Sequence, residues 1–87
     1  MNYKLSKFMA WQEAPSKGYL FIKNCQNNYL YKFTEVSKDI LLLLISGKSD
    51  YSIIKDLSDK YNVPVDILEN DYYEFIDSLI SEGLIVN

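Results

Sequence analysis

The chemistry open to this chain is limited first by the residue types it lacks. Its 87 residues include no histidine, which removes the usual general base near neutral pH, the commonest zinc ligand and the base of Ser/His and Cys/His nucleophile pairs. Cys25 is the single cysteine, and its neighbours Asn24 and Gln26 offer no cation to activate the thiol. The three glycines stand far apart, so no glycine-rich phosphate loop is present. We therefore predict no enzymatic activity, no metal site and no cofactor.

Binding chemistry is better represented, through aromatic rings and an uneven distribution of charge. Residues 1–34 carry five lysines and one glutamate, a net charge of +4, whereas residues 61–87 carry six acids and no lysine. These charges are either solvated faces that keep a tyrosine-rich protein soluble or part of a binding surface.

Length and composition predict one domain over residues 1–87. A chain of this length forms a single core, and 48% hydrophobic residues can fill it without a disulfide or a metal. The longest apolar run, residues 40–45, is far shorter than the roughly 20 residues that cross a bilayer. Residues 1–11 lack the apolar stretch of a secretory signal. We expect a cytoplasmic protein that does not enter a membrane.

The first third of the chain shows the patterns of β-strands. A loop is predicted over residues 12–18, where Pro15 cannot donate to a sheet, and a polar turn over residues 24–28. The apolar segment 19–23 is expected to be buried on both faces over most of its length. The strands are predicted over residues 3–8, 19–23 and 29–33.

From Thr34 onward the apolar residues recur at the 3.6-residue period of an α-helix. Thr34 and Ser49 are suitable N-caps, while Gly47 and Gly83 can take the left-handed conformation that ends a helix. Pro64 suits the first turn of a helix, where its missing N–H is not needed. Three helices are predicted, over residues 35–46, 50–61 and 64–82.

The order of these elements predicts an α+β fold, a winged helix-turn-helix in which a three-stranded antiparallel sheet is followed by three helices. Residues 84–86 are expected to pack on the core or to add an edge strand. A winged helix-turn-helix suggests a DNA-binding regulator, but residues 64–82 contain six acids and no base, and the chain has no arginine. DNA binding is therefore the alternative, and we expect no nucleic acid among the partners.

The strand at Tyr29–Phe33 lies at the edge of the predicted sheet and exposes unpaired N–H and C=O groups. Tyr29, Tyr31 and Phe33 share one of its faces, and Leu30 and Lys32 share the other. Lys32 and the ring bulk could shield this edge, or residues 84–86 could cover it. Alternatively, an extended peptide adds there as a fourth strand, with its side chains in a groove beside the third helix.

Two stretches of the chain carry a known pattern, YLYKFTEVSKDILLLLISGKSDYSIIKDLSDKYNV and LENDYYEFIDSLISEGLI. The strand-to-helix join at Phe33-Thr34, the turn at Gly47 and the pair Asp71-Tyr72 follow in an order and spacing that resemble the PqqD-like family. Members of this family, the RiPP recognition elements, bind leader peptides of ribosomally synthesised precursor peptides. The resemblance extends from Leu5 to Ile85. Ser46 departs from it, because many relatives have aspartate before this glycine.

The resemblance implies that a leader peptide pairs antiparallel with the third strand and lies against the third helix. The implied peptide-binding residues are Tyr29, Leu30, Tyr31, Lys32 and Phe33 of the strand and Leu68, Asp71, Tyr72 and Phe75 of the helix, with Leu79 as a further candidate. Which of the helix residues face the groove and which the core is left open. Asp71 either pairs with a lysine or arginine of the peptide or caps local backbone.

The partners implied by the resemblance are the precursor leader peptide and a separate maturation enzyme. That enzyme would be a radical SAM protein, a peptidase or a cyclase, and this chain would act as an adaptor, as a monomer or weak dimer. A structural subunit that dimerises or docks through the same edge is a third possibility.

Overall fold

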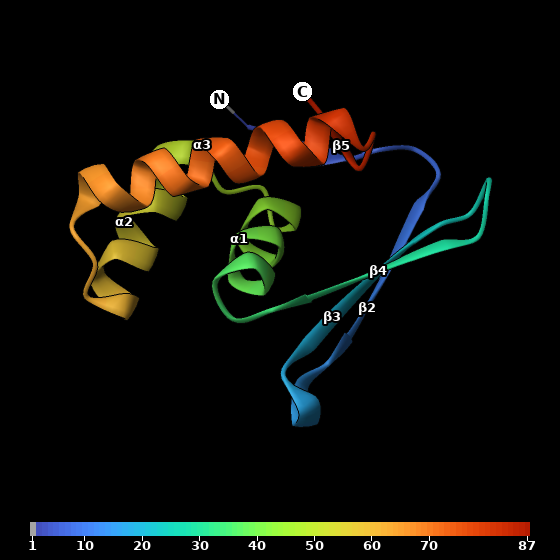
Figure 1. Ribbon diagram of the computed structural model, residues 1–87, viewed down its shortest axis with the longest axis horizontal. Coiled ribbons are helices and arrows are strands. Elements are labelled where there is room, and N and C mark those ends of the chain that lie inside the picture. Colours follow the sequence, from blue (N-terminus) through green and yellow to red (C-terminus); the bar gives the residue numbers. More distant parts are fainter. Residues whose placement is uncertain (1) are drawn as a thin grey trace.

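The computed structural model describes residues 2–87, and in it two separate β-pairings hold the strands (Figure 1). β1 (Lys4–Leu5) pairs antiparallel with β5 (Ile85–Val86), so the two ends of the described chain lie side by side. β2 (Met9–Ala14), β3 (Tyr19–Asn24) and β4 (Tyr29–Thr34) form an antiparallel three-stranded sheet in the order β2-β3-β4.

Three helices follow the sheet, as predicted: α1 (Glu35–Ile45), α2 (Asp50–Tyr61) and α3 (Val65–Ser81). The Ser49 side chain caps α2 by accepting a hydrogen bond from the Ser52 N–H, whereas the Thr34 side chain makes no capping bond. Asn62 and Gly83 take left-handed conformations beyond the ends of α2 and α3. The fold class predicted from the sequence, a three-stranded antiparallel sheet followed by three helices, is confirmed.

The start of the sheet was predicted wrongly. Instead of one strand over residues 3–8, the chain makes the two-residue β1, turns so that the Met9 N–H donates to the Ser6 carbonyl at 3.0 Å, and only then enters β2. Ser6 in this turn also contacts the C-terminal segment, because its hydroxyl donates to the Gly83 carbonyl at 2.7 Å. The predicted loop at 12–18 is correspondingly shorter, because residues 12–14 belong to β2 and a 3₁₀ turn occupies Pro15–Lys17.

The prediction that the segment 19–23 is buried on both faces over most of its length is also wrong. Leu20 and Ile22 are fully buried, Tyr19 and Phe21 are half-buried, and Lys23 is exposed. The helices cover only one face of the sheet, so every second residue of β3 lies against them.

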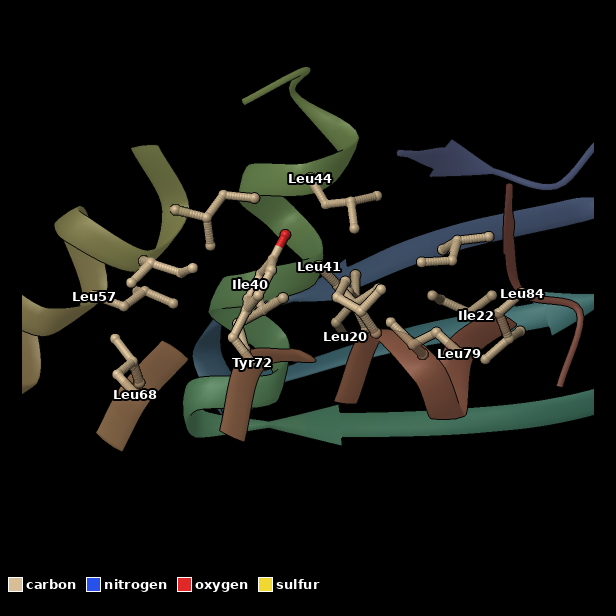
Figure 2. Packing of buried hydrophobic residues seen from close by; sticks show 14 residues of the cluster. Leu20, Ile22, Ile40, Leu41, Leu44, Leu57, Leu68, Tyr72, Leu79 and Leu84 are labelled. Carbon is tan, nitrogen blue, oxygen red and sulfur yellow. The ribbon is translucent and has the colours of Figure 1, made fainter. Parts of the chain in front are cut away.

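The core lies between that face of β3 and the apolar sides of the three helices (Figure 2). It consists of Leu20, Ile22, Ile40, Leu41, Leu44, Ile53, Ile54, Leu57, Leu68, Tyr72, Ile76, Leu79, Leu84 and Ile85. Leu84 and Ile85 thus pack on the core, while β5 pairs with β1 and leaves β4 uncovered. The tail therefore packs on the core, as the first alternative predicted, but it adds no strand to the three-stranded sheet and does not cover β4.

Candidate functional site

The ladder hydrogen bonds of the sheet show which backbone groups of β4 point outward. Met9 pairs with Asn24, which places Phe8 opposite Cys25, and the Cys25 N–H donates to the Phe8 carbonyl at 2.9 Å. Bonding direction alternates along an antiparallel strand, so the odd residues of β3 bond to β2 and the even residues bond to β4.

The even residues of β3, Leu20, Ile22 and Asn24, pair with Phe33, Tyr31 and Tyr29 of β4. These three β4 residues therefore direct their N–H and C=O groups inward, toward β3. The N–H and C=O groups of Leu30 and Lys32 point away from the sheet, on a side where no strand within residues 2–87 pairs with β4. We call these groups the free edge.

An aromatic row on one face of β4 connects this strand to α3. The rings of Tyr29 and Tyr31 lie 5.2 Å apart between centroids, those of Tyr31 and Phe33 lie 6.4 Å apart, and Phe33 packs edge-on against Phe75 of α3 at 6.0 Å. The Tyr31 hydroxyl donates to the Glu82 carboxylate at 3.2 Å. Loss of solvent around the ring and this hydrogen bond raise the pKa of Tyr31. The row confirms the predicted sharing of one face by Tyr29, Tyr31 and Phe33.

On the opposite face of β4, Leu30 is 61% exposed, and the Lys32 ammonium lies 4.5 Å from the centre of the Tyr19 ring. Both side chains therefore lie on the side of the sheet away from α3.

A hollow of about 300 Å³ lies where α1, the α2–α3 connection and α3 meet. Its walls include all four of the α3 residues implied by the family resemblance. Val36, Ser37, Ile40, Tyr61, Val63, Leu68, Asp71, Tyr72 and Phe75 line it. Phe75 belongs to both features, because it lines the hollow and contacts Phe33 of the aromatic row. We call the hollow and the row together the groove.

The four α3 residues have different exposure within this wall. Leu68 and Tyr72 are only 5% and 1% exposed, so most of each side chain belongs to the core. Asp71 is exposed and Phe75 is half-buried. Leu79, at 2% exposed, is a core residue and does not line the hollow.

Tyr72 directs its hydroxyl into the interior, where it donates to the Asp50 carboxylate (the hydroxyl is red in Figure 2). Burial and this hydrogen bond raise the pKa of Tyr72. Its ring thus forms the floor of the hollow, while its polar atom joins α3 to α2.

Comparison with known proteins identifies the family of this chain. The family model for coenzyme PQQ synthesis protein D (PqqD) matches residues 21–85, which span the free edge and the groove. This chain belongs to the PqqD family.

Two solved structures share the fold of this PqqD-family chain. One, described as TbiB1 in complex with the TbiA(beta) leader peptide, has a TM-score of 0.87 and 21% identity over 94% of this chain and 93% of that chain. The other, a lasso peptide synthetase B1 complexed with the leader peptide, has a TM-score of 0.89 and 15% identity over 100% of both chains. No protein of curated function matches the sequence.

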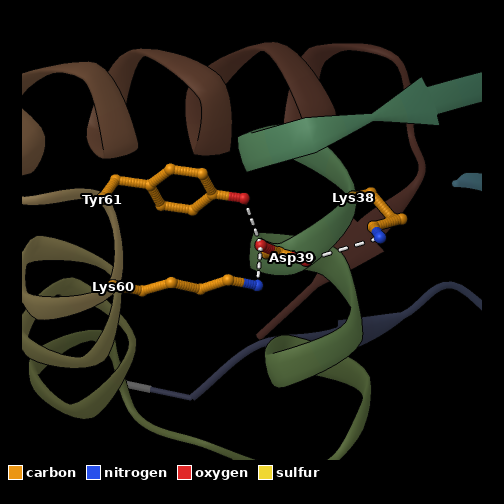
Figure 3. Close-up of polar contacts among 4 residues, drawn as sticks. All are labelled: Lys38, Asp39, Lys60 and Tyr61. Carbon is orange, nitrogen blue, oxygen red and sulfur yellow. Dashed lines mark hydrogen bonds and ion pairs between the residues drawn. The ribbon is translucent and has the colours of Figure 1, made fainter.

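A polar cluster that sequence reasoning missed fixes one wall of the groove in this PqqD-family chain (Figure 3). The Asp39 carboxylate of α1 accepts hydrogen bonds from the Tyr61 hydroxyl and, at 2.8 Å, from the Lys60 ammonium, and Lys38 lies 3.8 Å away. Burial alone would raise the pKa of Asp39, but the bonds from Lys60 and Tyr61 lower it below its ordinary value. An acid directly before the apolar run 40–45 was the signal in the sequence.

A second hollow, of about 520 Å³, lies on the other flank of α3, against α2. It is lined by Asp50, Tyr51, Ile54, Lys55, Asp59, Val65, Glu69 and Tyr73, none of which was predicted as a site residue. Within residues 2–87 no cluster of three possible metal ligands occurs, and no helix is long and apolar enough to span a membrane. The DNA-binding alternative gains no support, because α3 of this PqqD-family chain carries five acids and no base.

Proposed function

We propose that this chain binds the leader peptide of a ribosomally synthesised precursor peptide, by addition of the leader as a strand to the free edge. The observation that carries the proposal is the free edge of β4, on the strand whose aromatic row contacts α3 at the groove. Strand addition to an exposed sheet edge gives affinity through main-chain hydrogen bonds, and specificity through pockets for alternate side chains. Both similar structures are described as complexes with a leader peptide, which supports the same role here.

The groove is needed as well as the free edge. Leu30 and Lys32 offer two donors and two acceptors, and such bonds contribute a net of about 0.5–1.5 kcal/mol each. The four bonds together contribute about 2–6 kcal/mol, whereas association costs on the order of 4–15 kcal/mol in lost freedom, so the ladder alone gives little net affinity. An apolar side chain in the hollow, against Phe75 and the ring of Tyr72, would add about 1.5–3 kcal/mol. The proposed leader therefore carries an aliphatic or aromatic anchor near the Phe33 end of β4.

The proposed role requires no catalysis by this chain. A domain that holds the leader raises the effective concentration of the core peptide at a separate maturation enzyme, which performs the chemistry. That enzyme would be a radical SAM protein, a peptidase or a cyclase.

The test uses a synthetic leader peptide, taken from a short precursor gene sought beside this protein's gene and titrated into the ¹⁵N-labelled chain. We expect amide shifts at β4, the hollow and α3. Lys32→Pro, which removes an outward N–H, should abolish binding without unfolding the chain, because proline is tolerated at a sheet edge whose N–H faces solvent.

Two matched variants separate the backbone from the side chain. Lys32→Ala keeps the N–H and should bind normally, and Glu13→Pro removes an outward N–H from the opposite edge of the sheet, at β2, and should also bind normally. Wild-type affinity in Lys32→Pro, or shifts confined to β2, would rule out strand addition to β4.

A further inference from the structure

The side of α3 that faces the groove carries one narrow stripe of residues. Successive helical residues are separated by about 100°, so Asp71, Phe75, Ser78 and Glu82 fall within about 60° of one another. Phe75 contacts Phe33, Glu82 accepts the Tyr31 hydroxyl, and Asp71 lines the hollow, which shows that the stripe faces the groove. The groove therefore has a carboxylate near each end and an aromatic ring between them.

No cation of residues 2–87 balances these two carboxylates from within the groove. Lys32 lies on the opposite face of β4, against Tyr19. Lys38 and Lys60 both pair with Asp39, and neither lines the hollow. Neither Asp71 nor Glu82 has an ion pair with a lysine, so a bound peptide meets two acids there.

The end of α3 adds to the negative potential at Glu82. The last turn of α3 has no basic residue, and a helix C-terminus carries a partial negative charge from its free carbonyl groups. A cationic side chain of a peptide is favoured at this position by both the carboxylate and the helix end.

We propose that the groove selects leader segments with two basic residues, four or six positions apart, around an apolar anchor. This rests on the proposed strand addition. Asp71 and Glu82 are eleven residues apart, about 16 Å along the helix, and an extended chain covers that distance in about five residues. Because only alternate side chains of a strand face α3, the two basic residues must be separated by an even number of positions.

The test is selection of peptides of about twelve residues, long enough to span the groove, from a random display library on the immobilised chain. We expect enrichment of lysine or arginine at two positions of that spacing, with an aliphatic or aromatic residue between them. One enriched peptide is then titrated by fluorescence anisotropy against the wild-type chain and two double variants.

Asp71→Asn with Glu82→Gln removes both groove carboxylates, and we expect the affinity to fall about four- to twenty-fivefold at low salt, from about two- to fivefold per pair. The loss should shrink as salt increases. Glu74→Gln with Asp77→Asn removes the same charge from α3 outside the stripe. It should change the affinity less than twofold, because these exposed charges do not contact the peptide and their field is screened by salt.

The outcomes separate this inference from the proposed function. Enriched peptides without basic residues, or equal losses in the two double variants, overturn the charge selection when Lys32→Pro still abolishes binding. If no peptide is enriched, or if Lys32→Pro binds the enriched peptides normally, strand addition itself fails and the charge selection fails with it.

Discussion

The Tyr31 hydroxyl lies 3.2 Å from the Glu82 carboxylate, so the middle of the edge strand is tied to the residue that ends α3. Together with the Phe33–Phe75 contact, this bond sets the spacing between the strand and the helix before any peptide arrives. A groove held in its bound geometry loses less freedom on binding, which increases affinity without adding contacts to the peptide.

We predict that Tyr31→Phe weakens leader binding about two- to fivefold and changes the free energy of unfolding by less than about 0.5 kcal/mol, because the lost bond is exposed. Isothermal titration and urea denaturation measure the two quantities. Tyr29→Phe, at a side chain that is 61% exposed, is the control and should alter neither. An equal loss of affinity in both variants would contradict a positioning role for the Tyr31 hydroxyl.

Tyr72→Phe is expected to lower stability and to leave peptide affinity unchanged. The change removes one hydrogen bond to Asp50, a residue that is only 7% exposed, at a cost of about 1–3 kcal/mol for a buried hydrogen-bonding group. Tyr51→Phe, at a ring that is 73% exposed, should stay within about 0.5 kcal/mol of the wild-type chain. If Tyr72→Phe also loses leader binding while folded, the hydroxyl contacts the peptide rather than the core.

The stability of the chain should depend on pH through Asp39. The pKa of Asp39 is lowered in the folded state. Its contribution to the free energy of unfolding is therefore fully present above the unfolded pKa of about 3.9, and it is lost as pH falls through the lower folded pKa. Asp39→Asn should therefore cost about 1–2 kcal/mol near neutral pH and much less in strong acid. Urea denaturation over a pH series measures this, with the exposed Asp56→Asn as the control. A cost for Asp39→Asn that is constant with pH would disprove the ion-pair account.

Glu35→Gly is expected to stabilise the chain by about 0.5–1 kcal/mol. Glu35 has φ of 52° at the join of β4 and α1, a left-handed conformation that costs a residue with a Cβ roughly 1–2 kcal/mol. Glycine removes that strain but adds freedom to the unfolded chain, which offsets part of the gain. Asn62→Gly, at φ of 54°, should be close to neutral because asparagine tolerates this region. Thermal denaturation measures the change in stability, and a melting temperature of Glu35→Gly below that of the wild-type chain would refute this prediction.

The hairpin, the aromatic row and the three helices were predictable because each rests on local signals. The alternation in Tyr29–Phe33, the cap at Ser49 and the left-handed Gly83 act within a few residues. β2 was not predicted, because its local signals indicate a loop. Gln12 and Glu13 lie before Pro15 and look like loop residues, and only the pairing with β3 makes them a strand.

Two parts of the site could not be predicted from the sequence. The outward direction of Leu30 and Lys32 depends on the register of two hairpins, which alternation within one strand does not determine. The roles of Tyr72 and Phe75 depend on how α3 is rotated against α1, since both belong to the same apolar stripe in the sequence. That rotation buries Tyr72 and leaves Phe75 half-buried at the groove.

The pairing of β1 with β5 makes the chain a nearly closed ring, because Lys4 lies opposite Val86. A short linker between residues 2 and 87 could therefore join the ends, and the ring could be reopened at the exposed turn 25–28. In such a circular permutant β4, the strand proposed to pair with the leader, would become the first segment of the polypeptide, with its lateral pairing to β3 kept but its hairpin connection removed.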